Sequence, residues 1–434
     1  MAKKKALIIT YYWPPGGGSG VQRWLKFVKY IGDFGWEPII YTPSNPEYPS
    51  EDMSLQKDIQ ENIAVIKRPI KEPYRLYRAF SGKKSSEKIQ TGFLNESGKS
   101  SFKEIISRWL RGNLFIPDAR KYWIKPSIKF LSSWLKTNPV DVIISTGPPH
   151  SMHMIALRLK QNYDNIPWVA DYRDPWTGVY YFNDLKLSKA ALKKHKRLEK
   201  RCLENADQII VVGDTMKHDF EKITSTPVSV ITNGFDSADY NAVKSEKAEK
   251  FNIMYTGTFL PQQNPGELWE VLREMLKSNS NFGKHLKISC IGKTDVEIIK
   301  AIEKNGLKEY LELTQYVPHK DIPQLQQKAA VLLLCLNRIE NASYIITGKV
   351  FEYLASGRPI LAICPEESDV AKIIKETDAG EVVPFADKKR LSESINLMFE
   401  KHTKGILMAN NKNFEQYSRY ELTRSLSKLL DNII

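Results

Sequence analysis

The stretch ALIITYYWPPGGGSGVQRWLKF (residues 6–27) joins a short apolar run to a segment with helical apolar spacing through a glycine-rich loop. Residues 6–10 predict a buried strand, and residues 21–34 predict the helix that follows it. Glycines between a strand and a helix are compatible with a bound phosphate, a closely fitting sugar or only a tight turn. The remainder of the chain has to distinguish these possibilities.

Alternating strand and helix signals continue along the whole chain and fall into two halves. This alternation predicts parallel sheets with helices on both faces, so the expected fold class is α/β with two doubly wound domains. A length of 434 residues also exceeds what one hydrophobic core usually serves. The predicted strands are residues 6–10, 38–42, 63–66, 140–145, 168–171, 208–212 and 228–231, then 252–255, 286–291, 331–335, 359–363 and 381–383.

The composition is that of a soluble globular protein, with 42% hydrophobic and 26% charged residues. No apolar run reaches the roughly 18 residues of a membrane-spanning helix. The four cysteines are scattered without metal or disulfide spacing, which favours reduced thiols and a cytoplasmic location.

The net charge of +14 is concentrated in residues 1–200, whereas the rest of the chain is close to neutral. A surplus of this kind attracts nucleic acid, an anionic membrane or a phosphate-bearing substrate. A basic surface without a partner is the alternative. The chain contains no RNA- or DNA-binding motif, so nucleic acid is not an expected partner.

A basic insertion is predicted at about residues 80–125. Its polar first part, residues 81–101, is followed by a basic and aromatic stretch. There Ile105, Ile106, Trp109 and Leu110 form one apolar stripe of a predicted helix. A stripe with basic flanks suits a membrane edge or a lipid-bearing partner, but a helix that faces the core has the same pattern and is the interpretation we favour.

Ligands of doubly wound sheets bind beyond the carboxyl ends of the strands, so the residues after each strand matter most. After the first strand, Gly16, Gly18 and Gly20 lack the final spacing of a dinucleotide fingerprint, and no acidic residue ends the next strand. This loop is still able to bring backbone N–H groups to an anion at the start of the helix.

Two further strand ends in the first half carry titratable groups. His150 and His153 follow one strand, and Asp171, Arg173 and Asp174 follow the next. Two carboxylates beside an arginine favour a general base or a hydroxyl-binding site. The alternative is that these residues only fix loops.

In the second half, Gly257 and Gly292 each follow a strand, and Lys349 lies near the start of a predicted helix. A lysine at a helix N-terminus is suited to a diphosphate. Glu352 lies three residues on, on the same helix face, where a carboxylate is able to bind both ribose hydroxyls. A surface Lys–Glu pair is the alternative.

Four motifs in this order resemble the family 4 glycosyltransferases: PPGGGSGVQRW, WVADYRDPW, VITNGFD and GKVFEYLASGRPILAI. The resemblance covers nearly the whole chain. It implies the GT-B fold, in which two Rossmann-like domains face each other across a cleft and a C-terminal helix crosses back. The expected domains are residues 1–236, a linker at 237–250, a nucleotide-sugar-binding domain at 251–410 and the returning helix at 411–434.

The resemblance also assigns roles to residues. Gly16, Gly17 and Gly18 approach the donor diphosphate and the acceptor. Gly257 and Gly292 are also expected on the donor side, because of their positions at strand ends. Glu352 matches the second glutamate of the family's E-x7-E motif and binds the ribose, and Val317 lies where backbone groups contact the base. The remaining assignments place Asn233 and Asp236 in the hinge.

This sequence departs from the family pattern at two places. Tyr344 replaces the first glutamate of E-x7-E, and the usual arginine and lysine after the first strand of the second domain are replaced within TGTFLPQQNPGEL by Thr258, Gln263 and Asn264. Lys349 is therefore our candidate to neutralise the leaving diphosphate. The departures indicate a divergent branch.

The predicted activity is transfer of a hexose from a nucleoside-diphosphate sugar to a hydroxyl, with retention and without a metal or cofactor. Asp174, then Asp171, are expected to orient or deprotonate the acceptor, unless the departing phosphate takes that proton. His153 is a further catalytic candidate, and His150 and Arg173 are placed on the acceptor side.

The expected acceptor is a glycan or a lipid-linked glycan, as in cell-surface polysaccharide synthesis, handled at the inner face of the membrane. Two other functions stay open from the sequence. One is a nucleotide-sugar epimerase on the same fold, and the other is a non-catalytic protein that binds membranes or polyanions.

Overall fold

The computed structural model describes all residues apart from 1–2, 73–101, 180–181, 183–184, 241–247 and 316. The chain divides into two compact units, which are described separately. Unit 1 contains Met1–Thr232 and Leu422–Ile434, and unit 2 contains Asn233–Glu421. The polar first part of the predicted insertion lies outside the described residues.

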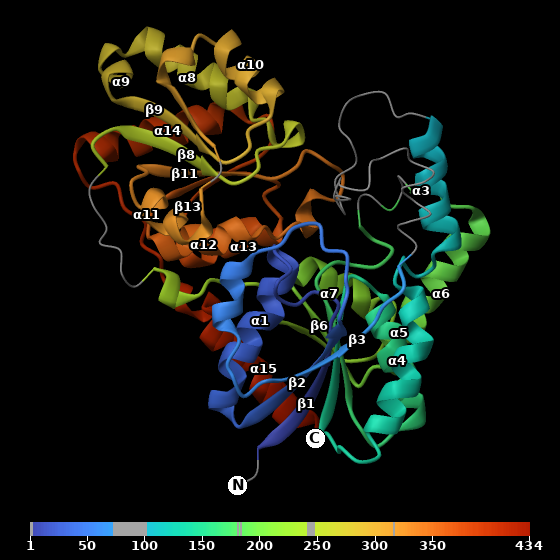
Figure 1. The fold of residues 1–434 in the computed structure, drawn as a ribbon. Helices are drawn as coiled ribbons and strands as arrows, with labels where there is room; N and C mark the ends of the chain where they lie inside the picture. The colour runs from blue at the N-terminus through green and yellow to red at the C-terminus, as the bar shows by residue number, and fades with distance from the viewer. Residues whose placement is uncertain (1–2, 73–101, 180–181, 183–184, 241–247, 316) are drawn as a thin grey trace. The chain divides into compact units, whose positions relative to one another are not determined.

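Unit 1 is built on a parallel sheet that has seven strands within the described residues, in the order β3-β2-β1-β4-β5-β6-β7 (Figure 1). The chain winds outward from β1 in one direction and from β4 in the other, as in doubly wound folds. The strands are β1 (Lys4–Ile9), β2 (Trp36–Pro43), β3 (Ala64–Arg68), β4 (Val142–Gly147), β5 (Trp168–Tyr172), β6 (Gln208–Val211) and β7 (Val228–Val230).

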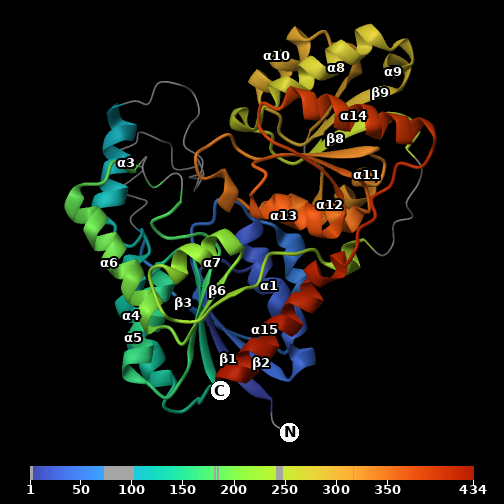
Figure 2. The ribbon, with the colours of Figure 1, turned by 180° about the vertical axis from the view of Figure 1, so that it is seen from behind.

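One face of this sheet is covered by α1 (Ser19–Ile31) and α15 (Arg419–Ile433), which lie side by side in both views (Figures 1 and 2). The α15 helix places three leucines at intervals of four residues in the same core cluster as α1, namely Leu422, Leu426 and Leu430. Burial of each leucine stabilises the unit by about 1.5–3 kcal/mol. The end of the chain is therefore part of unit 1.

The other helices of unit 1 follow the insertion and the later strands. In both views α4 lies beside α5, and α3 lies beside α6 (Figures 1 and 2). Their bounds are α3 (Phe102–Leu114), α4 (Lys121–Trp134), α5 (Ser151–Asn162), α6 (Lys189–Asn205) and α7 (Asp214–Glu221).

Unit 2 repeats the same winding order in a six-stranded parallel sheet of the described residues, β10-β9-β8-β11-β12-β13. Successive residues of β8 point to opposite faces: Ile253 and Tyr255 join one core cluster, and Met254 joins the other. The strands are β8 (Phe251–Thr256), β9 (Leu286–Ile291), β10 (Leu311–Thr314), β11 (Val331–Cys335), β12 (Ile360–Ile363) and β13 (Gly380–Val383).

Helices cover both faces of the second sheet. One cluster takes apolar residues from α8 (Gly266–Ser278), α10 (Val296–Lys304) and α14 (Lys388–Thr403), and the other takes them from α12 (Gly348–Ser356) and α13 (Asp369–Thr377). The shorter helices are α9 (Ser280–His285) and α11 (Ile322–Gln326). The prediction of two parallel-sheet α/β domains is confirmed.

The chain segments that connect the units are bonded to each other inside unit 2. The N–H of Phe235 donates to the carbonyl of Tyr417 (3.2 Å), and the N–H of Arg419 donates to the carbonyl of Phe235 (2.7 Å). The predicted hinge residue Asp236 accepts a hydrogen bond from the N–H of Ala238 at 3.2 Å. The segment that leaves unit 1 and the segment that returns to it therefore run together at this point.

Candidate active site

The winding order marks where ligands are expected in each unit. It reverses between β1 and β4 in unit 1 and between β8 and β11 in unit 2. In doubly wound sheets a crevice opens at such a reversal, beyond the carboxyl ends of the strands. The predicted site residues that follow β1, β4, β5, β8 and β9 all lie at these edges.

The glycine-rich loop of unit 1 leads directly into α1. The N–H of Gly17 donates to the carbonyl of Ser50 (2.9 Å), and Gly16 forms a short bridge to Glu51. Gly18 is the N-cap of α1 with φ 89°, a left-handed conformation that favours glycine. No side chain caps this helix and its first turn has no acidic residue, so its N–H groups suit an anion.

Arg173 packs against the first turn of α1. A Cβ atom on Gly20 would lie 2.5 Å from Nη1 of Arg173, so any larger residue at this position would force the guanidinium to shift. The guanidinium also donates from Nε to the carbonyl of Gly147 (3.3 Å) and lies 5.4 Å from the ring centre of Tyr12. Asp174, the next residue, is exposed to solvent. Arg173 and Asp174 are thus together beside the glycine-rich loop.

Asp171 lies in a different environment from Asp174, because it is completely buried and paired with Arg23 at 2.7 Å. It also accepts hydrogen bonds from the Trp24 indole and the Thr146 hydroxyl, both at 2.8 Å. Burial alone would raise the pKa of Asp171, but the Arg23 charge and these bonds hold the pKa below its usual range. This arrangement favours a structural role over a role as base.

The loop after Asp174 is held by α6. The carboxylate of Glu199 accepts hydrogen bonds from the N–H groups of Trp176 (3.0 Å) and Thr177 (3.1 Å) and from the Thr177 hydroxyl (2.5 Å). The Trp176 indole donates to Nδ1 of His195 (3.0 Å), whose Nε2 lies 3.2 Å from the carbonyl of Gly112. These contacts fix the backbone that carries Asp174.

The structure brings His150 and His153 together at the end of β4. Their ring centres are 5.8 Å apart, and both rings are buried. His150 stacks on Trp176 with centres 4.7 Å apart and ring planes 1° apart, whereas His153 stacks on Tyr172 at 4.2 Å. Burial lowers the pKa of His153 to about 3 and the pKa of His150 well below its ordinary value, so both rings are neutral at neutral pH.

Three of the predicted donor-side residues are in contact in unit 2. Gly257 (φ 99°) and Gly292 (φ 111°) pack so closely that a Cβ on Gly292 would lie 2.5 Å from the carbonyl oxygen of Gly257. The side chain of Lys349 lies over Gly257, with Cε 3.0 Å from the position of its absent Cβ. Burial lowers the pKa of Lys349, and the Glu352 charge opposes this change. A cation thus lies directly above a bare glycine backbone.

Glu352 is half-buried on the same helix as Lys349. Its carboxylate lies 3.5 Å from Nε2 of Gln326, which also donates to the Thr256 hydroxyl (3.3 Å). The other amide atom of Gln326 accepts a hydrogen bond from the Tyr240 hydroxyl (3.1 Å). Gln326 and Tyr240 are the polar residues here that sequence reasoning missed, because neither belongs to a motif or follows a strand.

Two of the residues that depart from the family pattern described above form hydrogen bonds within their own loop. Gln263 accepts hydrogen bonds from the Tyr255 hydroxyl and the N–H of Leu260, and Asn264 accepts one from the Trp269 indole. These amides stabilise the turn before α8. Thr258 is exposed, Tyr344 is half-buried, and Val317 packs against the core cluster that contains α12.

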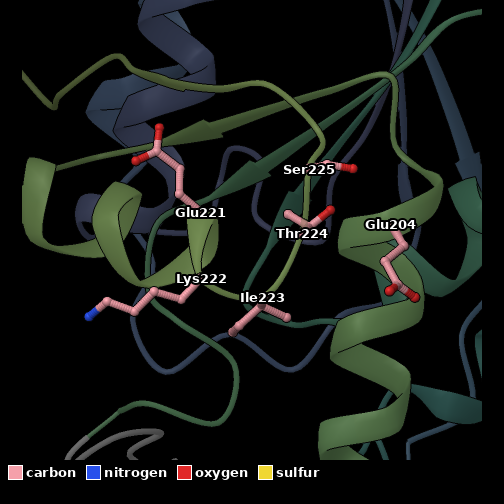
Figure 3. Close-up of a pocket in the computed structure, with 6 residues that line it drawn as sticks. All are labelled: Glu204, Glu221, Lys222, Ile223, Thr224 and Ser225. Carbon is pink, nitrogen blue, oxygen red and sulfur yellow. The ribbon is translucent and has the colours of Figure 1, made fainter.

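A hollow of about 310 Å³ in unit 1 lies away from this site (Figure 3). Glu204 is in the last turn of α6, and residues 222–225 connect α7 to β7. Since these segments lead into the amino ends of strands, the hollow is at the opposite edge of the sheet. Among the described residues, no group of three or more His, Cys, Asp and Glu side chains is placed to hold a metal ion.

Several solved structures resemble the whole chain. Sucrose-phosphate synthase from Thermosynechococcus elongatus is 12% identical (TM-score 0.59), and HepE from Anabaena in complex with UDP-glucose is 13% identical (TM-score 0.61); each match covers 99% of both chains. A mutant of S. aureus TarM with fondaparinux, alpha-GlcNAc-glycerol and UDP is 12% identical (TM-score 0.59), covering 99% of this chain and 100% of that chain. The chain therefore has the GT-B fold of glycosyltransferases.

Two family models match consecutive parts of the sequence. Residues 92–239 match Glycosyltransferase Family 4, and residues 236–419 match Glycosyl transferases group 1. The protein belongs to the family 4 glycosyltransferases. No curated protein sequence matches it.

Proposed function

We propose that the protein transfers a hexose from a nucleoside-diphosphate sugar to a hydroxyl acceptor with retention of the anomeric configuration. The observation that carries this proposal is the contact of Lys349 with Gly257, beside Gly292 and on the helix of Glu352. A cation over bare backbone suits a diphosphate, and a carboxylate one turn away suits ribose hydroxyls. The UDP-glucose of HepE and the UDP of TarM are consistent with such a donor.

Charge develops on the diphosphate as the sugar leaves, so groups that bind this charge accelerate the reaction. Lys349 and the N–H groups near Gly257 and Gly292 would supply this stabilisation, each charge-assisted contact contributing about 2–4 kcal/mol when water is excluded. The proposal uses no metal ion and no cofactor. Glu352 would position the nucleotide through its ribose, and Val317 lies where the base is expected.

The acceptor would be bound by unit 1. Asp174 is exposed at the edge of the sheet and would orient or deprotonate the hydroxyl. Arg173 and His150 would bind the acceptor, and the N–H groups of the glycine-rich loop at Gly16–Gly18 would bind phosphate oxygens of the donor. In a retaining transfer the departing phosphate is also able to take the acceptor proton, so the loss of Asp174 need not abolish turnover.

A panel of nucleoside-diphosphate sugars tests this function. We expect one of them to raise the melting temperature and then to yield a glycosylated product, whose anomeric configuration is read by NMR coupling constants. An isomerised sugar nucleotide formed without acceptor would identify an epimerase instead. Absence of binding to every member of the panel would contradict the proposal and favour a non-catalytic role.

We also propose that unit 1 binds an anionic membrane surface, where a lipid-linked acceptor for cell-surface polysaccharide would be presented. The observation that supports this proposal is a set of exposed apolar side chains, here called the α3 patch: Ile106, Trp109, Leu114 and Tyr122. Our expectation that the stripe faces the core is wrong for Ile106 (39% exposed) and Trp109 (43%). The side chain of Ile105 lies outside the described residues, and Leu110 is half-buried.

The two helices that carry most of the α3 patch also carry exposed basic residues. Arg111, Lys125 and Lys129 are exposed on α3 and α4. Apolar side chains with cationic neighbours are typical of helices that lie at an anionic lipid interface. None of the helices in the described residues has the length and apolar character needed to cross a bilayer. The proposed contact is therefore peripheral.

Trp109→Ala should weaken binding to vesicles that contain phosphatidylglycerol by about tenfold or more, because burial of a large apolar side chain is worth ~1.5–3 kcal/mol. Binding should also weaken with added salt, since charges are screened over about 8 Å at physiological ionic strength. Met408→Ala is the matched control, because Met408 is 72% exposed in unit 2. Equal binding of the wild type to neutral and anionic vesicles would contradict the proposal.

A further inference from the structure

Two ring nitrogens at the end of β4 are buried without a hydrogen-bond partner within the described part of the chain: Nδ1 of His150 and Nε2 of His153. Both approach the same residue, because a Cβ on Gly147 would lie 3.1 Å from the first nitrogen and 2.5 Å from the second. Buried polar atoms are nearly always bonded in native proteins. The pair therefore needs an explanation in terms of what these nitrogens bind.

The hydrogen bonds on the other side of His153 favour one position for its proton. The Trp168 indole donates to Oγ of Ser145 (2.9 Å), and an indole N–H is able only to donate. Nδ1 of His153 lies 2.8 Å from the same oxygen. If Ser145 accepts from Trp168 and donates its own proton to His153, every group in this chain is satisfied.

His153 then accepts at Nδ1 and, as a neutral ring, carries its proton on Nε2. The ring is expected to be uncharged at neutral pH, because burial disfavours its charged form. The Nε2–H group of His153 faces Nδ1 of His150 across Gly147. The two nitrogens are complementary as donor and acceptor, and since they form no direct bond, one water molecule between them would complete both hydrogen bonds.

We propose that four residues form a hydrogen-bond chain in which each donates to the next: Trp168, Ser145, His153 and His150. This chain fixes the proton of His150 on Nε2. Ser145 and His153 are positioning residues in this chain, and His150 is the group that meets the substrate. The role of His150 rests on the proposed glycosyl transfer, whereas the direction of the chain does not.

This direction changes what His150 is able to do. With its proton on Nε2 and Nδ1 occupied, the ring donates a hydrogen bond to a substrate oxygen and does not accept a proton from the acceptor hydroxyl. The stacking of His150 on Trp176, whose indole is bonded to His195, holds the ring in place for this purpose. The acceptor proton then goes to Asp174 or to the leaving phosphate.

The tautomers are measured directly in the full-length protein labelled with 15N-histidine, using two-bond 1H–15N correlation spectra at neutral pH. The protein has seven histidines, and loss of one signal set in H150Q and in H153Q assigns the two rings. We expect both rings of the wild type to show the pattern of a proton on Nε2. A proton on Nδ1 of either ring would overturn the proposal without any variant.

Ser145→Ala should remove the single-tautomer pattern of His153 and His150 and lower kcat, with the KM for the donor unchanged. Ser127→Ala is the matched control: Ser127 is a fully buried serine of unit 1 that accepts a hydrogen bond from Tyr41 (2.9 Å) and is not a member of the proposed chain. An unchanged His153 pattern in S145A would contradict the chain. If no sugar nucleotide is turned over, the proposed function fails while the spectra still decide the tautomers.

Discussion

Lys349→Ala is expected to lower kcat by about 10²–10³-fold, the usual loss when one preorganised group that stabilises developing charge is removed. Lys349 lies over Gly257, which itself contacts Gly292, so its ammonium is held above the backbone that would receive the diphosphate. The donor affinity should fall less than kcat, because the charge on the leaving group grows in the transition state. Steady-state kinetics and calorimetric titration with the nucleoside diphosphate separate these two effects.

Lys277→Ala is the control for Lys349→Ala. Lys277 is an exposed lysine in the last turn of α8 in the same unit, so its removal changes the net charge by the same amount. Both variants should keep the circular dichroism spectrum of the wild type. Full donor affinity and full turnover in Lys349→Ala would show that this residue is not part of the mechanism. The backbone N–H groups would then have to stabilise the charge of the leaving diphosphate without it.

The strands of both sheets were predictable because most of them are apolar runs buried on two faces. β11 (Val331–Cys335) has the sequence VLLLC and every residue of it is buried, which gives an unambiguous signal between two helices. β10 (Leu311–Thr314) was missed for the opposite reason: it is a short edge strand whose last three residues are exposed, so its sequence LELT has no buried run. The edge strands β3 (AVIKR) and β7 (VSV) contain valine or isoleucine and were predicted, so the lack of these residues in β10 accounts for the difference.

The site was predictable as a set of strand ends but not as a set of roles. Asp171 and Asp174 are the same residue type at the end of one strand, and the sequence placed them together. Which of the two is buried depends on Arg23, which is 148 positions away in the chain. The same holds for Gln326, which reaches Glu352 from a separate helix. Long-range partners of this kind leave no local pattern in a single sequence.

Asp171→Asn is expected to lower the free energy of unfolding of unit 1 by about 3–5 kcal/mol, because it removes the charge that is paired with the buried Arg23 at 2.7 Å. Asp174→Asn is the matched control at an exposed position three residues on. It should change this free energy by no more than about 0.5 kcal/mol while it lowers turnover. Urea unfolding followed by tryptophan fluorescence suits the measurement, because Trp269 is the only one of the nine tryptophans that belongs to unit 2.

The pH dependence of this difference tests its electrostatic origin. The folded-state pKa of Asp171 lies below its ordinary value, so its contribution to stability is complete above the unfolded pKa of about 3.9 and disappears as the pH falls through the folded pKa. The stability gap between wild type and Asp171→Asn should therefore stay constant from pH 7 to about pH 5 and narrow only in stronger acid. If Asp171→Asn is as stable as the wild type at pH 7, or loses turnover without losing stability, the structural role of Asp171 is contradicted. Asp171 would then be a candidate for the reaction itself, and Asp174 would be one of two carboxylates that act on the acceptor.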